Sequence, residues 1–123
     1  MVINPEIKRD ERGELWEILH AKDCNNSIKG QIYAFSINPG AVRGNHFHKR
    51  KKEWFSVISG ECLLILKENG NEEEINLSEN LHQVVEVKPN AIHTFKNESK
   101  KPAIIIAYID EEFNSEDSDT FYS

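Results

Sequence analysis

Hydrophobic and polar residues alternate with a period of two along most of the chain, and no long segment follows the helical period of 3.6. The alternating segments are short, rich in β-branched and aromatic residues and bounded by turn formers; they are residues 30–38, 53–59, 61–68, 73–77, 82–87, 92–97 and 103–109. Between two of them the sequence ENGN predicts a tight hairpin, because Asn-Gly supplies the positive φ angles that such a turn needs. Many short strands at regular spacing predict an all-β sandwich or barrel, with a jelly roll among the candidates.

Length and composition favour a single domain. The chain has 123 residues, of which 38% are hydrophobic and 29% charged, and no linker-like segment or internal repeat interrupts it. We therefore expect one domain over residues 1–123. Its last part, residues 110–123, is acidic and rich in turn formers, and composition alone would make it a flexible tail.

The sequence carries no signal for export, membrane insertion or polyanion binding. The N-terminus lacks the apolar run of a signal peptide, and no apolar run is long enough to span a bilayer. The cysteines are widely separated and form no CxxC pattern, which favours reduced thiols. A formal net charge of -6 argues against general nucleic-acid binding. We expect a cytoplasmic protein with no nucleic-acid partner and no membrane partner.

Residues 44–55, GNHFHKRKKEWF, contain two histidines beside the densest cluster of positive charge. On a strand, residues two apart face the same side, so His46 and His48 would project into one cavity. Glu53 can return to that side if it begins the next strand, and long-range strand pairing could bring His93 beside them. Three imidazoles and a carboxylate suit a divalent transition metal. An HxH pair on its own more often occurs by chance, with its histidines on the surface or satisfied in the core.

The basic residues 49–52, KRKK, have two interpretations. They could form a patch for a polyanion, or a solvated turn that also deters edge-to-edge pairing of strands. We favour the solvated turn, because the chain as a whole is acidic.

The spacing around the histidines matches a longer pattern, G-x5-HxH-x4-E-x6-G, in which Gly40, His46, His48, Glu53 and Gly60 fill every defined position. This pattern resembles the first motif of the cupin superfamily. The resemblance implies an all-β, cupin-type double-stranded β-helix, which is a jelly-roll barrel. It also implies a metal site at the histidines and the glutamate.

The second cupin motif is recognisable but altered. The segment VEVKPNAIHTFKN keeps its histidine as His93 and, four residues later, its asparagine as Asn97. The usual proline is displaced by one position, and His82 replaces the opening glycine. Asn90 stands at the motif's second glycine; asparagine tolerates the left-handed conformation better than other non-glycine residues, so the turn can survive.

The segments DERGELWEIL, PGAVRGNHFH and FNSEDSDTF run almost from one end of the chain to the other. Together they resemble the C-terminal cupin domain of the CapF family of capsular polysaccharide assembling proteins and, more distantly, nucleotide-sugar epimerases and ketoisomerases such as dTDP-4-dehydrorhamnose 3,5-epimerase. The last segment resembles the ending F-D-P-x-x-P-D-T, of which Phe113, Asp119 and Thr120 remain. The resemblance implies that residues 110–123 pack on the barrel, contrary to the interpretation from composition.

The CapF-type resemblance implies a zinc ion and epimerisation next to the 4-keto group of a UDP-sugar. Such a reaction removes a proton alpha to a carbonyl, stabilises the enolate and returns a proton on the opposite face. A Lewis-acidic metal lowers that barrier by several kcal/mol. The same ligand set also binds Mn, Fe or Ni.

The role of His46 differs between the two resemblances. In the rhamnose-pathway epimerase the matching histidine is a metal-free general base, and a ligated nitrogen cannot also abstract a proton. The presence of His48, Glu53 and His93 favours the role of ligand for His46. A base must then come from elsewhere in the chain. The candidates are Lys49, Tyr33, Tyr108 and His82.

Arg43 precedes the first histidine in the segment R-G-x-H, where the resemblance implies a contact with the nucleotide diphosphate of the substrate. A guanidinium fork suits a diphosphate, whereas the alternative is an exposed arginine at a strand entrance. The resemblance also implies a homodimer, which we expect to pair through an edge strand or an N-terminal strand. Because no reductase domain accompanies the cupin, we expect either a separate reductase as a partner protein or a different pathway.

Three functions remain open from the sequence. The first is a metal-dependent epimerase or isomerase acting on a nucleotide-activated keto-sugar in surface polysaccharide biosynthesis. The second is a metal-dependent cupin dioxygenase or another enzyme acting on a small acid, and the third is a non-catalytic cupin that senses a sugar or a metal. The resemblance outside the metal motif favours the first.

Overall fold

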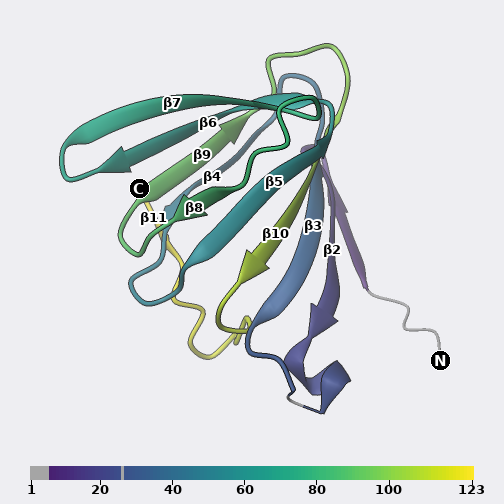
Figure 1. Cartoon of the computed structure of the whole chain (residues 1–123), viewed down its shortest axis with the longest axis vertical. Coiled ribbons are helices and arrows are strands. Elements are labelled where there is room, and N and C mark those ends of the chain that lie inside the picture. Colours follow the sequence, from purple (N-terminus) through teal and green to yellow (C-terminus); the bar gives the residue numbers. More distant parts are fainter. Residues whose placement is uncertain (1–5, 26) are drawn as a thin grey trace.

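Two antiparallel sheets enclose one apolar core in the computed structural model, which describes residues 6–25 and 27–123 (Figure 1). One sheet has six strands in the order β1-β2-β3-β10-β5-β8, and the other has five in the order β11-β4-β9-β6-β7. The elements are β1 (Ile7–Asp10), β2 (Gly13–His20), η1 (Ala21–Cys24), β3 (Gln31–Ile37), β4 (Val42–Phe47), β5 (Glu53–Ser59), β6 (Glu61–Glu68), β7 (Asn71–Ser78), β8 (Val85–Val87), β9 (Ile92–Lys96), β10 (Ala103–Ile109) and β11 (Phe121–Tyr122). Within the described residues, no helix is long and apolar enough to cross a membrane.

A strand forms in each of the seven segments that the alternating pattern predicts, and the hairpin is confirmed. Asn69 and Gly70 have φ values of 51° and 80° between β6 and β7, as an Asn-Gly turn requires. The segment predicted over residues 82–87 is shorter than expected, since only Val85–Val87 forms β8. Asn90 has a φ of 71°, so it replaces the motif glycine in the left-handed conformation as expected.

The core forms where inward rows of the two sheets meet. Phe35 on β3 and Phe55 on β5 contact Phe95 on β9, with ring centroids 5.6 Å and 5.0 Å from that of Phe95. Strand side chains alternate between faces, so Glu53 and His93, two residues before Phe55 and Phe95, lie on the same inward rows. A polar cluster therefore lies directly beside the apolar core, inside the same barrel.

The last segment of the chain lies against the barrel. Phe121 and Tyr122 form β11, which pairs with Phe47 and His46 at the edge of the five-stranded sheet. The flexible tail that composition alone suggests is therefore not observed. The assignment of residues 1–123 to one domain stays a prediction, because residues 1–5 and 26 lie outside the described residues.

Candidate metal centre

Four polar side chains converge from separate elements. His46 comes from β4, His48 follows that strand, Glu53 begins β5 and His93 lies on β9; one ligand atom from each lies within 4.8 Å of all the others. His48, Glu53 and His93 are buried, and His46 is partly buried. The ring of His46 lies 4.4 Å from that of His93, centroid to centroid. The structure thus brings the predicted ligands together in a cluster that could hold a metal ion.

A bulge in β4 explains why both Arg43 and His46 face inward. In a regular strand, residues three apart face opposite sides. The pairing of β4 with β9 shifts in register between Gly44 and His46, and Gly44 and Asn45 have φ values of 93° and 58°. The extra residue reverses the alternation. A Cβ at Gly44 would lie 2.6 Å from the carbonyl oxygen of His93, so only glycine fits there.

Backbone carbonyl groups orient two of the histidines. Nδ1 of His48 lies 2.8 Å from the carbonyl oxygen of Asp119, and Nδ1 of His93 lies 3.3 Å from that of Ala91. Because a carbonyl oxygen can only accept, we assign a proton to Nδ1 of both rings. Their Nε2 atoms then face Oε1 of Glu53, at 2.6 Å from His48 and 3.5 Å from His93. A lone pair that faces a carboxylate needs a proton or a cation between them.

The residues present fit a divalent metal ion. Nε2 of His93 is buried and has no hydrogen-bond partner in the part of the chain that the structure describes. Leaving a polar atom buried and unpaired costs about 1–3 kcal/mol. The hydroxyl of Tyr33 donates to Oε2 of Glu53 at 2.5 Å, which leaves Oε1 directed at the histidines. A cation among the imidazoles and Oε1 would satisfy the unpaired nitrogen.

Burial and neighbouring charges set the protonation of the cluster. Burial disfavours a charge on Glu53, but the hydrogen bond with His48 and the nearby ring of His93 outweigh it and lower the pKa of Glu53. Burial likewise opposes a charge on His48, yet its hydrogen bond to Glu53 raises the pKa of His48 above 6.5. The pKa of His46 falls to about 4, first through burial and then through the charges of His93 and His48. Burial and the charge of Glu53 raise the pKa of Tyr33, which therefore stays protonated.

Two cavities meet at the cluster. The first has a volume of about 210 Å³, and its polar lining includes His48, Glu53 and Lys51. The second has a volume of about 190 Å³, and its lining includes Arg12, Arg43, His93 and Tyr122. Leu15, Tyr33 and His46 line both cavities. A molecule that occupied both cavities would therefore contact the histidine cluster.

The predicted bases lie in different places, and of the four only Tyr33 lines these two cavities. The ammonium group of Lys49 lies 4.3 Å from the ring centroid of Phe121. Tyr108 donates its hydroxyl to the carbonyl oxygen of Lys29. His82 is exposed in the loop before β8, with a φ of 50°.

Arg43 is buried rather than exposed at a strand entrance. Its side chain lies beside Phe35, with the guanidinium carbon 5.5 Å from the ring centroid, and its Nε donates to the carbonyl oxygen of Ser36 at 3.0 Å. Burial lowers the pKa of Arg43, and the positive charge of Arg12 adds to that effect. Among the ion pairs of the described residues, none involves Arg43, so its charge is not neutralised by a carboxylate.

The interpretation of residues 49–52 as a solvated turn is wrong for Lys51, whereas Lys49 and Arg50 are exposed as expected. Lys51 is only 2% exposed, and its ammonium group donates to the carbonyl oxygens of Ser118 at 3.0 Å and Glu112 at 3.4 Å. Arg50 pairs with Glu111. The sequence held a signal for these contacts, because KRKK and the acidic residues 110–119 are complementary in charge.

Known proteins share both sequence and fold with this chain. A family model described as "Polysaccharide biosynthesis C-terminal domain" matches residues 8–121. A UDP-2-acetamido-2,6-beta-L-arabino-hexul-4-ose reductase of Pseudomonas aeruginosa is 30% identical over 114 residues, which cover 91% of this chain. The same match covers 29% of the reductase, so the chain spans less than a third of that relative's length.

Solved structures establish the fold. The capsular polysaccharide assembling protein CapF from Staphylococcus aureus matches with a TM-score of 0.87 and 24% identity, over 98% of this chain and 32% of that chain. A mutant of oxalate decarboxylase from Bacillus subtilis matches with a TM-score of 0.80 and 19% identity, over 97% of this chain and 30% of that chain. The fold is the cupin-type double-stranded β-helix, as the sequence predicts.

Proposed function

Because the chain belongs to the family of polysaccharide biosynthesis C-terminal domains, we propose that it is a metal-dependent epimerase or isomerase of a nucleotide-activated keto-sugar. The observation that carries this proposal is the buried cluster of His46, His48, Glu53 and His93 between two cavities. The relative that is 30% identical is named for a UDP-linked hexul-4-ose, which is a keto-sugar on a nucleoside diphosphate. Since the chain spans only 29% of that protein, we carry over the class of substrate and not the reduction.

In this proposal, the four clustered side chains hold one divalent ion, with zinc as the first choice. Imidazole nitrogens and a carboxylate oxygen suit zinc, and the same donors accept Mn, Fe or Ni. When bound, the ion would supply Lewis acidity for the carbonyl and enolate oxygens of the substrate. The carbonyl groups of Asp119 and Ala91 orient two of the rings, and Tyr33 holds one oxygen of Glu53.

Tyr33 is the proton-transfer candidate that the geometry favours, because it lines both cavities beside the cluster. Its raised pKa and its donated hydrogen bond to Glu53 keep the phenol protonated at neutral pH. A phenol in this state suits the return of a proton to the enolate better than the removal of one. Lys49, Tyr108 and His82 line neither cavity, and the group that removes the proton is not among them in this proposal.

Arg43 would bind the diphosphate in the second cavity, with the sugar next to the cluster. Its neighbour Arg12 already pairs with Asp10, whereas Arg43 forms no ion pair with the described residues. An unpaired guanidinium favours a phosphate ligand, which can accept two parallel hydrogen bonds from it.

The test is metal analysis of the purified protein, followed by incubation with UDP- and dTDP-4-keto-sugars in deuterated water. We expect one divalent ion per chain and incorporation of solvent deuterium at a carbon next to the keto group. Oxygen uptake with a small acid, and no deuterium in any keto-sugar, would instead support a dioxygenase. Metal binding without turnover of either class would support a sensing cupin.

We also propose a homodimer that pairs through β1. All four residues of β1 are exposed, and this strand pairs on one side only, with β2, among the described residues. Light scattering at micromolar concentration should give twice the mass of the chain, and a monomer would contradict the dimer alone. A separate reductase partner and a cytoplasmic location stay predictions from the sequence.

A further inference from the structure

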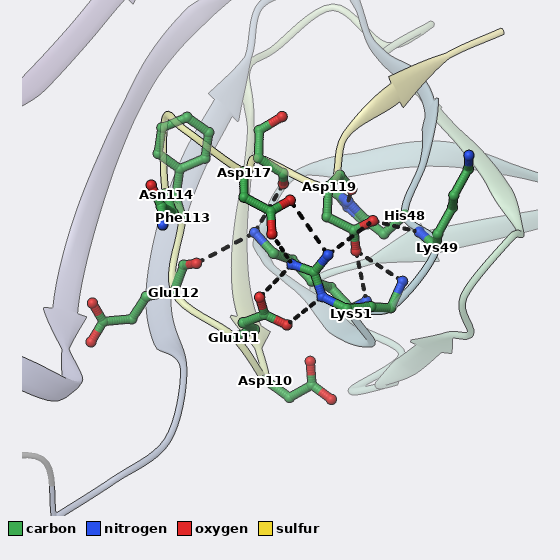
Figure 2. A network of polar contacts seen from close by, with 12 residues as sticks. His48, Lys49, Lys51, Asp110, Glu111, Glu112, Phe113, Asn114, Asp117 and Asp119 are labelled. Carbon is green, nitrogen blue, oxygen red and sulfur yellow. Dashed lines mark hydrogen bonds and ion pairs between the residues drawn. The ribbon is translucent and has the colours of Figure 1, made fainter.

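Residues 110–122, which we name the C-terminal strap, lie across residues 49–52, which we name the basic turn (Figure 2). At the start of the strap, Asp110 and Lys52 exchange two hydrogen bonds: the amide of Lys52 donates to Oδ1 of Asp110 at 3.0 Å, and the amide of Asp110 donates to the carbonyl oxygen of Lys52 at 3.1 Å. At its end, β11 pairs with β4. Both ends of the strap are therefore fixed beside residues of the cluster, because Lys52 directly precedes Glu53 and β4 carries His46.

Asp119 makes the central contacts of the strap. Its carboxylate accepts hydrogen bonds from three consecutive backbone amides, those of Lys49 at 3.1 Å, Arg50 at 2.9 Å and Lys51 at 3.0 Å. Its own carbonyl oxygen accepts the proton of Nδ1 of His48 at 2.8 Å. Asp119 is only 5% exposed and has a φ of 50°. One residue thus connects the basic turn to a side chain of the cluster.

The basic turn binds the strap in return. The ammonium group of Lys51 donates to the carbonyl oxygen of Glu112 (Figure 2) and to that of Ser118. The guanidinium of Arg50 pairs with Glu111 and Asp117. These contacts join charged groups on one segment to acceptors on the other. Loss of one contact therefore weakens the fit of the whole strap rather than a single bond.

We propose that Asp119 is a positioning residue of the metal site, and that docking of the strap and metal binding stabilise each other. The hydrogen bond to the carbonyl of Asp119 keeps the proton of His48 on Nδ1 and directs Nε2 into the cluster. A metal ion binds only to this arrangement of the ring, so it favours the docked strap. The coupling is reciprocal, because two events that stabilise a common state strengthen each other equally. This inference rests on the metal site of the proposed function.

Docking of the strap also completes the wall of the first cavity. Phe113 and Thr120, both in the strap, line that cavity together with His46, His48 and Glu53. A ligand that fills the cavity beside the cluster contacts the strap directly. The strap is therefore part of the site rather than an appendage of the barrel.

The first experiment measures zinc affinity by competition with a chromophoric chelator. Asp119→Ala removes the three contacts to the basic turn, and we expect zinc to bind about 10- to 100-fold more weakly. Asp119→Asn keeps one oxygen acceptor and should recover part of this loss. Glu116→Ala is the matched control: it removes an acidic, exposed side chain from the same segment, for which the described residues offer no side-chain contact, and affinity should not change.

The second experiment measures amide hydrogen exchange of the wild-type chain with and without zinc, so it does not depend on the folding of a variant. Zinc should slow exchange in residues 117–122 at least as strongly as around His48, and should leave the hairpin at residues 68–71 unchanged. The inference would be overturned if wild type and Asp119→Ala bound zinc with equal affinity, or if zinc did not change amide hydrogen exchange in the strap. Either result would leave the metal site intact. A wild-type chain that binds no zinc or other divalent ion would overturn the proposed function as well.

Discussion

At the scale of single residues, Tyr33 and Tyr108 show how position decides what the same side chain does. Both donate a hydroxyl hydrogen bond, but the acceptor of Tyr33 is the buried carboxylate of Glu53 and that of Tyr108 is a backbone carbonyl at an exposed site. The sequence placed them together as candidate bases. The structure brings only Tyr33 to the two cavities.

Tyr33→Phe should therefore affect both stability and turnover. Removal of the hydroxyl leaves an oxygen of buried Glu53 unpaired, which we expect to lower the free energy of unfolding by about 1–3 kcal/mol. If Tyr33 returns the proton, turnover of the keto-sugar should fall by about 10²- to 10⁴-fold. Urea denaturation and a deuterium-incorporation assay measure the two effects. Tyr108→Phe is the control, and an equal loss in both variants would contradict the special role of Tyr33.

Arg43→Ala tests the diphosphate contact. Hydrogen bonds to charged groups contribute roughly 1.5–3 kcal/mol, so the nucleotide sugar should bind about 10- to 100-fold more weakly. Metal content should not change, because Arg43 does not belong to the cluster. Isothermal titration with the nucleotide sugar gives the affinity, and elemental analysis gives the metal content. Arg9→Ala, at an exposed position, should bind normally; unchanged affinity in Arg43→Ala would exclude the contact.

Protonation of His48 predicts opposite effects of pH on stability and on metal affinity. In the metal-free protein, the hydrogen bond to Glu53 raises the pKa of His48 above its ordinary value of 6.5. The resulting stabilisation is fully present below the unfolded-state pKa and is lost as pH rises through the folded-state pKa. Metal binding needs the same nitrogen without its proton, so affinity should rise over that range.

These two trends can be measured separately. Urea denaturation of chelator-treated protein at a series of pH values gives the stability, and zinc competition at the same values gives the affinity. His48→Gln should flatten the decline in stability. If stability and zinc affinity rose together with pH, proton and metal would not compete for His48.

At the scale of elements, the bulge in β4 determines which side chains enter the site. Residues 43 and 46 would face opposite sides of a regular strand, and the extra residue at the register shift turns both inward. The bulge thus places Arg43, which suits a phosphate, and His46, which suits a metal, on the same side of β4. Without the bulge, the regular alternation of side chains would place them on opposite faces of the strand.

Gly44→Ala should therefore damage the site more than an average glycine substitution would. The new Cβ would lie 2.6 Å from the carbonyl oxygen of His93 at a φ of 93°, so β4 and β9 would have to separate. We expect a loss of stability of about 1–3 kcal/mol and weaker metal binding. Gly40→Ala is the matched control, because its φ is 80° but no heavy atom lies within 4 Å of the new Cβ. Thermal unfolding and zinc competition should distinguish the two variants, and equal metal affinity in both would contradict the role of the bulge.

At the scale of the whole molecule, the apolar core and the polar cluster share the interior of one barrel. Metal binding should then stabilise the entire fold, because the ligands come from β4, β5 and β9 in both sheets. A ligand at about 1,000 times its dissociation constant contributes about 4 kcal/mol. Removal of the metal with a chelator should therefore lower the melting temperature by roughly 10–20 °C. Differential scanning calorimetry measures this shift, and His93→Ala, which lacks one ligand, should show little response to the chelator.

The sequence by itself determined the all-β fold, seven of the strands, the hairpin at Asn69 and Gly70, and the four residues of the cluster. These features follow from local rules. Side-chain alternation defines a strand, Asn-Gly permits positive φ angles, and a motif of fixed spacing marks positions that face one another in the folded barrel. The sequence did not predict β1 as a strand, because every residue of β1 is exposed and it lacks a hydrophobic row.

Only the tertiary structure decided the burial of Lys51, the contacts of Asp119 and the inward position of Arg43. Each depends on a partner far away along the chain or on a change of register, and the hydrophobic pattern records neither. Residues 49–52 and 110–119 have opposite charges. The attraction between opposite charges falls off slowly with distance, so it does not specify which atoms meet. The hydrogen bonds that make Asp119 part of the site depend on direction as well as distance, so they become visible only when both segments are placed.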